Sequence, residues 1–174
     1  EIIQSDKAVY TIYKYAKMES TNAFLKKHCS SLPDYAVIRA EEQTDGRGRF
    51  TRIWNSQAGL DLTFSILLPL TSLEQQRRQN ITQIAALSIA QALEGYGLKP
   101  SVKWPNDVLI QGKKISGILC EITEIDERVC GVLGIGINVN NTEKFLASLD
   151  IPATSLRCEL RHKVVRKDLL KKLL

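Results

Sequence analysis

The amino-acid sequence predicts an α+β fold, in which a mostly antiparallel or mixed sheet is covered by helices. Segments rich in β-forming residues outnumber amphipathic helical segments, and short turns separate neighbouring strand segments. The chain has 174 residues, of which 44% are hydrophobic and 25% charged, a composition typical of one globular domain with its own core. No apolar run reaches the roughly 18 residues that a membrane-spanning helix needs, so we expect no membrane partner.

The first half of the chain predicts three strands and one short helix. Its β-branched, aromatic and apolar residues predict strands at 8–15, 36–41 and 60–68. Between the first two strands, Ser20 or Thr21 is a suitable N-cap for a helix that ends at the break formed by residues 31–34. Residues 42–58 are polar, and we expect them to form a long loop of the kind that carries binding residues.

The second half of the chain predicts a longer helix followed by two hairpins. Apolar residues recur at helical spacing over 81–94, and Gly95 and Gly97 end this helix. Residues 111–114 and 126–127 are typical hairpin turns. The remaining expected elements are strands at 101–104, 108–110, 115–125 and 128–139 and helices at 140–149 and 164–174.

The positive charge of the chain is confined to its C-terminal part. Lysine and arginine number 24 against 19 acidic residues, a formal net charge of +5. Residues 157–174 hold seven basic and two acidic residues and so carry the whole excess. A basic tail of this size favours nucleic-acid binding only weakly.

The cysteines and histidines do not have the spacing of a metal site. Cysteines at 29, 120, 130 and 158 show no CxxC spacing, and His28 and His162 lie far apart in the sequence. We therefore expect no protein-bound metal. Buried, reduced thiols are ordinary in a cytoplasmic protein, which is the location that we expect.

The segment 42–54 alternates glycines with arginines and ends in a tryptophan. Glycine allows a backbone to approach a ligand closely, and the arginine fork suits phosphate oxygens. A tryptophan suits stacking on a base. A flexible, solvated basic loop explains the same composition. The candidate binding residues of this segment are Gly46, Arg47, Gly48, Arg49, Arg52 and Trp54.

A second candidate, Lys103, ends a predicted strand and precedes the turn 104–107. A lysine between a strand and a rigid turn is held more firmly than an ordinary surface lysine. Its ammonium group suits the neutralisation of a carboxylate and a phosphate that are brought together for reaction. The alternative is a plain turn, in which Asn106 and Asp107 bond their own backbone.

Glycines are also dense in 131–139, a strand segment that ends at Asn138 and Val139. Val139 stands where GxGxxG needs glycine, which excludes the Rossmann fingerprint, and no GxxxxGK[ST] P-loop occurs. The glycines indicate either a bulged strand or the close approach of a ligand, with Asn138 beside a base or ribose. Residues 20–22 are ambiguous in the same way, because helix capping and binding of a polar ring both suit them.

Together these motifs resemble the biotin–protein ligases (biotin–[acetyl-CoA-carboxylase] ligases) over roughly residues 9–174. The landmarks of that family are an STN near the start, a glutamine before a GRGRxGRxW loop, KWPND, GKKxxGIL and GxGINV. The matching segments, in the same order and at similar spacing, are Ser20-Thr21-Asn22, Gln43, GRGRFTRIW (46–54), KWPND (103–107), GKKISGIL (112–119) and GIGINV (134–139).

The resemblance implies a ligase that forms biotinyl-5′-AMP and pyrophosphate from biotin and MgATP. Biotin then passes to a lysine of a biotin carboxyl carrier protein. Lys103 and Arg49 are the catalytic residues that it implies, with Lys103 at the biotin carboxylate and the α-phosphate. The ligand-binding residues that it implies are Ser20, Thr21, Asn22, Gln43, Gly46, Arg47, Gly48, Arg49, Arg52, Trp54, Lys103, Gly117 and Asn138.

Two features depart from the family pattern. Thr51 stands where the loop motif has its third glycine, and a β-branched residue resists a positive φ. The chain is also expected to be a single catalytic domain, residues 1–174, without the DNA-binding domain or the C-terminal β-barrel of some members. We therefore expect no DNA partner, and a homodimer is left open.

Two alternative functions compete with this interpretation. A lipoate–protein ligase or octanoyltransferase resembles the same fold, but those enzymes show an RRxxGGG-type motif where this chain has GRGRFTR. A nucleic-acid-binding module would use the arginine–glycine loop and the basic tail. It leaves the motifs at 103–107 and 131–139 unexplained.

We expect residues 44–53 to order on ligand binding. They include only two large apolar residues, Phe50 and Ile53, so burial of apolar area offsets little of an ordering cost of roughly 1–2 kcal/mol per residue. Phosphate oxygens at the arginines would supply the missing contacts. Hydrogen exchange across 44–53 should therefore slow when biotin and ATP are added, and equal exchange rates would refute coupled ordering.

Overall fold

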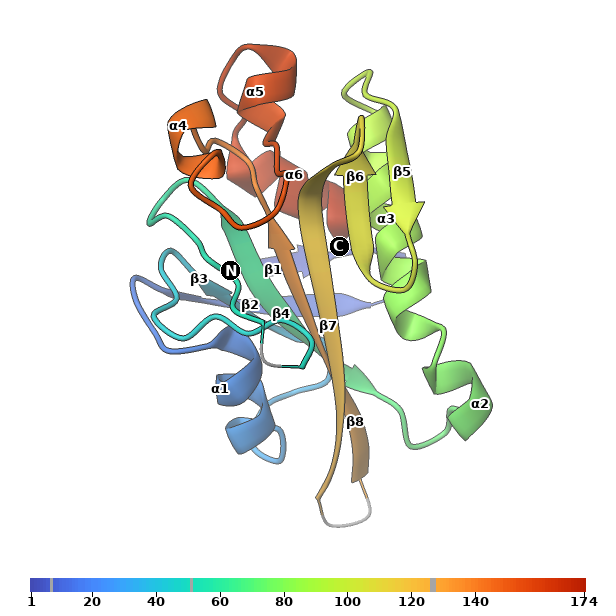
Figure 1. The fold of residues 1–174 in the computed structure, drawn as a ribbon. Helices are drawn as coiled ribbons and strands as arrows, with labels where there is room; N and C mark the ends of the chain where they lie inside the picture. The colour runs from blue at the N-terminus through green and yellow to red at the C-terminus, as the bar shows by residue number, and fades with distance from the viewer. Residues whose placement is uncertain (7, 51, 126–127) are drawn as a thin grey trace.

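The computed structural model describes residues 1–6, 8–50, 52–125 and 128–174. These residues form an eight-stranded sheet with the spatial order β1-β2-β3-β4-β8-β7-β6-β5 and six helices (Figure 1). The strands are β1 (Ile2–Gln4), β2 (Val9–Tyr15), β3 (Ala36–Ala40), β4 (Leu62–Pro69), β5 (Pro100–Lys103), β6 (Asp107–Ile110), β7 (Lys113–Ile125) and β8 (Arg128–Ile137). The helices are α1 (Thr21–His28), α2 (Gln75–Arg78), α3 (Ile81–Glu94), α4 (Glu143–Leu146), α5 (Leu156–Leu160) and α6 (Arg166–Leu173).

The sheet is mixed and mostly antiparallel, as the sequence predicts. Strands β2 and β3 run parallel, because α1 connects them and returns the chain to the same end of the sheet. The other neighbouring pairs are antiparallel. The predicted α+β class is confirmed.

Most predicted elements are confirmed, and some bounds and short elements differ. Ser20 caps α1 by accepting from Ala23 N at 3.4 Å, and α3 has the predicted bounds. The helix predicted at 140–149 is shorter and begins at Glu143, because the side chain of Thr142 caps it. The strand β1 and the helix α5 carry too few periodic apolar residues to be predicted.

The hairpin between β6 and β7 is tighter than predicted. Gln111 and Gly112 have φ of 49° and 78°, the two positive values that a two-residue hairpin loop requires. Lys113 and Lys114 therefore belong to β7 rather than to the turn. The predicted turn at 126–127 lies outside the described residues.

The two faces of the sheet have different partners. Alternate residues of β4 and β8, such as Phe64 and Ile135, pack with the core formed by α3 and α6. The opposite face contacts α1, where Leu25 lies in a smaller cluster with Val132. Figure 1 shows α1 and the pair α3 and α6 on opposite sides of the sheet.

On the α1 face of β4 and β8, the residues near the N-terminus of α1 are small or polar. Thr63 and Ser65 of β4 pair in register with Gly136 and Gly134 of β8. Because side chains alternate along a strand, none of these four residues fills the space above the sheet with an apolar side chain. This face therefore leaves room for a cavity.

Within the described residues, no helix is both long and apolar enough to cross a membrane.

Helix α3 offers a matched test of the core. Ile89 is 1% exposed and Ile84 is 62% exposed on the same helix. We expect Ile89→Ala to lower the free energy of unfolding by about 2–5 kcal/mol, because it leaves a cavity in the core. Ile84→Ala should change it by less than about 0.5 kcal/mol. Urea unfolding measures both, and equal effects would contradict the described packing.

Candidate functional site

A cavity of about 490 Å³ lies on the α1 face of the sheet. Its walls come from the N-terminus of α1, the glycine–arginine loop, β4, β7, β8 and the segment after α4. The sequence-predicted residues that line it are Ser20, Thr21, Asn22, Gln43, Arg47, Gly48, Arg49, Arg52, Trp54, Gly117 and Asn138. Segments far apart in the sequence thus converge on one space.

Glycines form the floor of the cavity. Gly136 of β8 pairs in register with Gly117 of β7, and a Cβ on Gly136 would overlap the indole of Trp54. A Cβ on Gly134 would likewise overlap the side-chain amide of Asn22. The close approach at these glycines is made by side chains of the protein itself, and the approach of a ligand stays a prediction.

Four side-chain oxygens form a row along one wall. Ser65 Oγ lies 2.6 Å from Asn22 Oδ1 and 2.6 Å from Thr21 Oγ1. Thr21 Oγ1 lies 3.0 Å from Gln43 Oε1, which also accepts from Thr21 N at 2.8 Å. These residues are held on α1, β4 and the loop after β3, so the row joins three parts of the chain.

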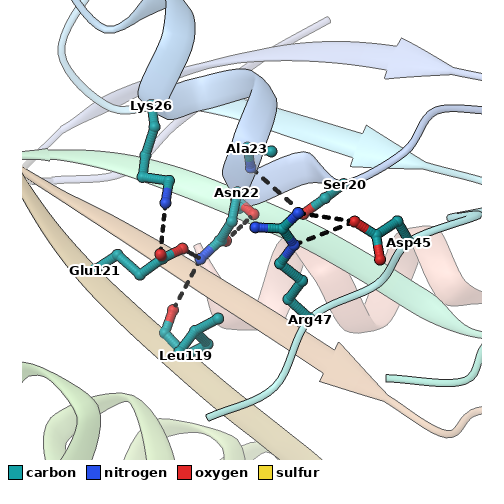
Figure 2. Close-up of polar contacts among 9 residues, drawn as sticks. Ser20, Asn22, Ala23, Lys26, Asp45, Arg47, Leu119 and Glu121 are labelled. Atoms are coloured by element: carbon teal, nitrogen blue, oxygen red, sulfur yellow. Dashed lines mark hydrogen bonds and ion pairs between the residues drawn. The ribbon is translucent and has the colours of Figure 1, made fainter. Parts of the chain in front are cut away.

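An ion pair supports the Asn22 end of this row, as Figure 2 shows. Asn22 Nδ2 donates to Glu121 Oε2 at 2.9 Å and to the carbonyl of Leu119 at 3.3 Å. Lys26 Nζ lies 2.6 Å from Glu121 Oε1. Burial raises the pKa of Glu121, but the hydrogen bonds from Lys26 and Asn22 outweigh burial and hold it below its ordinary value.

The glycine–arginine loop bends back on itself. Trp54 N donates to Gly46 O and Gly48 N donates to Arg52 O, both at 2.8 Å. Gly46 does not line the cavity; a Cβ there would lie 2.5 Å from the carbonyl oxygen of Trp54. A glycine is therefore needed at position 46 for the loop to close. Thr51 lies outside the described residues, so its predicted effect on this loop stays a prediction.

Two arginines of the loop face the cavity without an acidic partner among the described residues. Arg47 pairs with Asp45, with Nη2 2.9 Å from Oδ2. Arg49 and Arg52 line the cavity and form no ion pair within the described part of the chain. Their guanidinium groups are therefore available to an anionic ligand.

Lys114, rather than the predicted Lys103, is among the residues that line the cavity, and the catalytic role of Lys103 stays a prediction. Lys103 ends β5 as predicted, but it is exposed and does not line the cavity. Lys114 of β7 lines it, with Nζ 2.7 Å from Asp107 Oδ1 and 5.8 Å from the ring centroid of Trp54. Lys114 belongs to the GKKISGIL segment. Because the sequence predicts a turn at 111–114, Lys114 was not identified as a site residue.

Asn138 follows β8, as predicted, and lines the cavity beside the loop after α4. Its Nδ2 donates to the carbonyls of Thr154 and Lys114 at 3.0 and 3.4 Å. These two acceptors fix the amide, so Oδ1 remains the acceptor of this side chain. Sequence reasoning missed further lining residues that carry no motif: Thr63, Phe64, Leu149, Asp150, Ile151 and Ala153.

No group of three or more histidine, cysteine, aspartate or glutamate side chains is arranged to hold a metal in the part of the chain that the structure describes. Free cysteines at 29, 120, 130 and 158 are buried or half-buried. Burial raises the pKa of the Cys120 thiol to about 11, which keeps it protonated at neutral pH.

Comparison with known proteins assigns the chain to a family. The model of the biotin/lipoate A/B protein ligase family matches residues 15–138, and this stretch contains most of the cavity-lining residues. The chain belongs to the biotin/lipoate A/B protein ligase family. The resemblance seen in the sequence is thereby confirmed.

Two members of this family are similar to the chain in sequence. The bifunctional ligase/repressor BirA of Bacillus spizizenii is 37% identical over 148 residues, which are 83% of this chain and 45% of that protein. The biotin–[acetyl-CoA-carboxylase] ligase of Mycobacterium tuberculosis is 33% identical over 81% of this chain and 53% of its own length. The chain thus spans about half the length of these relatives.

A solved structure of the family has the same fold. The biotin protein ligase of Aquifex aeolicus in complex with biotin and ATP superposes with a TM-score of 0.75 and 34% identity. The match covers 93% of this chain and 66% of that one.

The floor glycine Gly136 can be tested with the fluorescence of Trp54. In a Trp104→Phe background, which removes a tryptophan that is 75% exposed, Gly136→Ala should shift the Trp54 emission to longer wavelength. The added Cβ displaces the indole from the floor into water. Gly48→Ala is the control, because its Cβ would meet Arg52 only at 3.4 Å. An unchanged Gly136→Ala spectrum would contradict the described position of the indole.

Proposed function

We propose that this chain is the catalytic part of an ATP-dependent biotin–protein ligase, which forms biotinyl-5′-AMP and transfers biotin to a lysine of a carrier protein. One observation carries the proposal: hydrogen-bonding oxygens of Thr21, Asn22 and Gln43 and the cations Lys114, Arg49 and Arg52 line one cavity. Biotin has the matching parts, a polar ureido ring and a carboxylate. The names of the relatives and the biotin and ATP of the Aquifex aeolicus structure support this choice.

The cations would remove the main obstacle to the first step. The biotin carboxylate must attack the α-phosphate of ATP, and these two anions repel each other. Lys114, Arg49 and Arg52 line the cavity, so their charges would reduce this repulsion and stabilise the charge of the transition state. Asp107 holds the ammonium group of Lys114 in place. We assign to Lys114 the role that the resemblance gives to Lys103.

The remaining lining residues would bind the nucleotide and the ring. Trp54 and Asn138 would bind the adenine, which offers a face for stacking and an amino group for an acceptor. The glycine–arginine loop would cover the adenylate and keep water away from the mixed anhydride. Magnesium would arrive as a ligand of the ATP phosphates.

The acceptor would be a biotin carboxyl carrier protein or domain of a biotin-dependent carboxylase. The name of the Mycobacterium tuberculosis relative, a biotin–[acetyl-CoA-carboxylase] ligase, supports this class of partner. A cytoplasmic location, a homodimer and the absence of a DNA partner stay expectations. Some relatives are named ligase/repressor, so the DNA expectation calls for its own binding assay.

The nucleic-acid alternative loses part of its support. Arg166 of the basic tail pairs with Glu41 at 2.8 Å, and Arg161 pairs with Glu143 at 3.0 Å. Lys172 lies 4.2 Å from the ring centroid of Tyr96. These cations contact the protein itself, which leaves fewer of them for phosphates.

The direct experiment is to incubate the chain with biotin, MgATP and a biotin-carrier domain. We expect a product that avidin detects and that disappears without ATP. Lipoate in place of biotin separates the two branches of the family, and transfer of lipoate alone would overturn the proposal. Biotin-dependent pyrophosphate release measures the first step even if transfer to the chosen carrier fails.

The two lysines offer a matched comparison. Lys114→Met should slow biotin-dependent pyrophosphate release by roughly a hundredfold or more, because it removes a positioned cation from the cavity. Lys103→Met should change it less than about threefold, because an exposed charge outside the cavity is screened by water. Thermal unfolding checks that both variants fold. A loss confined to Lys103→Met would return the catalytic role to Lys103.

A further inference from the structure

The oxygen row has fewer protons than contacts. Its three oxygen–oxygen contacts join the side chains of Asn22, Ser65, Thr21 and Gln43 at 2.6, 2.6 and 3.0 Å. The two hydroxyl groups supply two protons, and the amide oxygens at both ends supply none. One contact therefore lacks a proton whichever way the hydroxyl groups turn.

The missing proton belongs to the longest contact, at the Gln43 end of the row. Oxygens only 2.6 Å apart need a proton between them, so Ser65 donates to Asn22 Oδ1 and Thr21 donates to Ser65. The longer contact between Thr21 Oγ1 and Gln43 Oε1 is left with two acceptors. Both residues line the cavity, so a ligand N–H can donate to this pair.

This order depends on which way the amide of Asn22 is turned. If Nδ2 faced Ser65, it would supply the third proton, and the row would be satisfied without a ligand. Glu121 prevents this, because an ionised carboxylate only accepts and Asn22 must turn Nδ2 toward it. The carbonyl of Leu119 also accepts from Nδ2 and so favours the same orientation of the amide. Figure 2 shows the carboxylate and this carbonyl on one side of the amide.

We infer that Glu121 is a positioning residue for the ureido end of the substrate: it makes the row an acceptor for a ligand N–H by fixing the amide of Asn22. The inference rests on the proposed function for the identity of the ligand. Glu121 itself is absent from the cavity lining and acts through Asn22, Ser65 and Thr21. Lys26 keeps the carboxylate of Glu121 ionised, but the group that accepts from Asn22 and fixes its amide is the carboxylate itself.

The test compares three variants by calorimetric titration with biotin and, separately, with ATP. Glu121→Gln can donate as well as accept, so it frees Asn22 to turn and should weaken biotin binding about tenfold with ATP binding unchanged. Lys26→Met keeps the carboxylate and should stay within about threefold of wild type. Glu124→Gln, an exposed residue of the same strand, controls for charge and should bind biotin as wild type does. A general structural defect would weaken ATP binding as well.

A second readout needs no ligand. Side-chain amide protons of Asn22, followed by NMR, should exchange faster in Glu121→Gln than in wild type or Glu124→Gln. Biotin binding by Glu121→Gln at wild-type strength, or an unchanged Asn22 signal, overturns the inference and leaves the proposed function standing. Failure of the wild type to bind biotin overturns the proposed function, and the Asn22 signal then still decides whether Glu121 positions the amide.

Discussion

The close approach of two side chains to the backbone of β8 is the constraint on which the site depends. Trp54 and Asn22 lie where side chains of Gly136 and Gly134 would otherwise stand. Backbone hydrogen bonds to both neighbouring strands hold β8 in the middle of the sheet, so its floor is rigid. The loop and α1 are therefore placed by contact with a strand that has no side chains at these two positions.

The same alternation that forms the core forms the cavity. Apolar residues of β4 and β8 point toward α3 and α6, and burial of that face supplies most of the driving force for folding. The other face has little apolar area to bury at this position, so it can stay open to a ligand. Stability and function thus use opposite faces of the same two strands.

Charges in the structure fall into two groups. Two pairs, Lys26 with Glu121 and Lys114 with Asp107, contact the lining residue Asn22 or include the lining residue Lys114. Both pairs are only partly exposed, so water screens them less than surface pairs. Arg49 and Arg52 line the cavity without an acidic partner among the described residues. The first group positions side chains, and the second is suited to receive the charge of a ligand.

The sequence by itself determined the class of the fold, most strands and helices, and eleven of the residues that line the cavity. Periodicity sufficed for α3, and the glycine and arginine motifs identified the loop, because these signals are local in the chain. Only the tertiary structure decided that β2 and β3 are parallel, that Lys114 rather than Lys103 lines the cavity, and that Ser65 and Glu121 support the binding residues. Each of these depends on contacts between residues far apart in the sequence. Lys103 and Lys114 both lie beside a turn, so their local sequence does not show which of them lines the cavity.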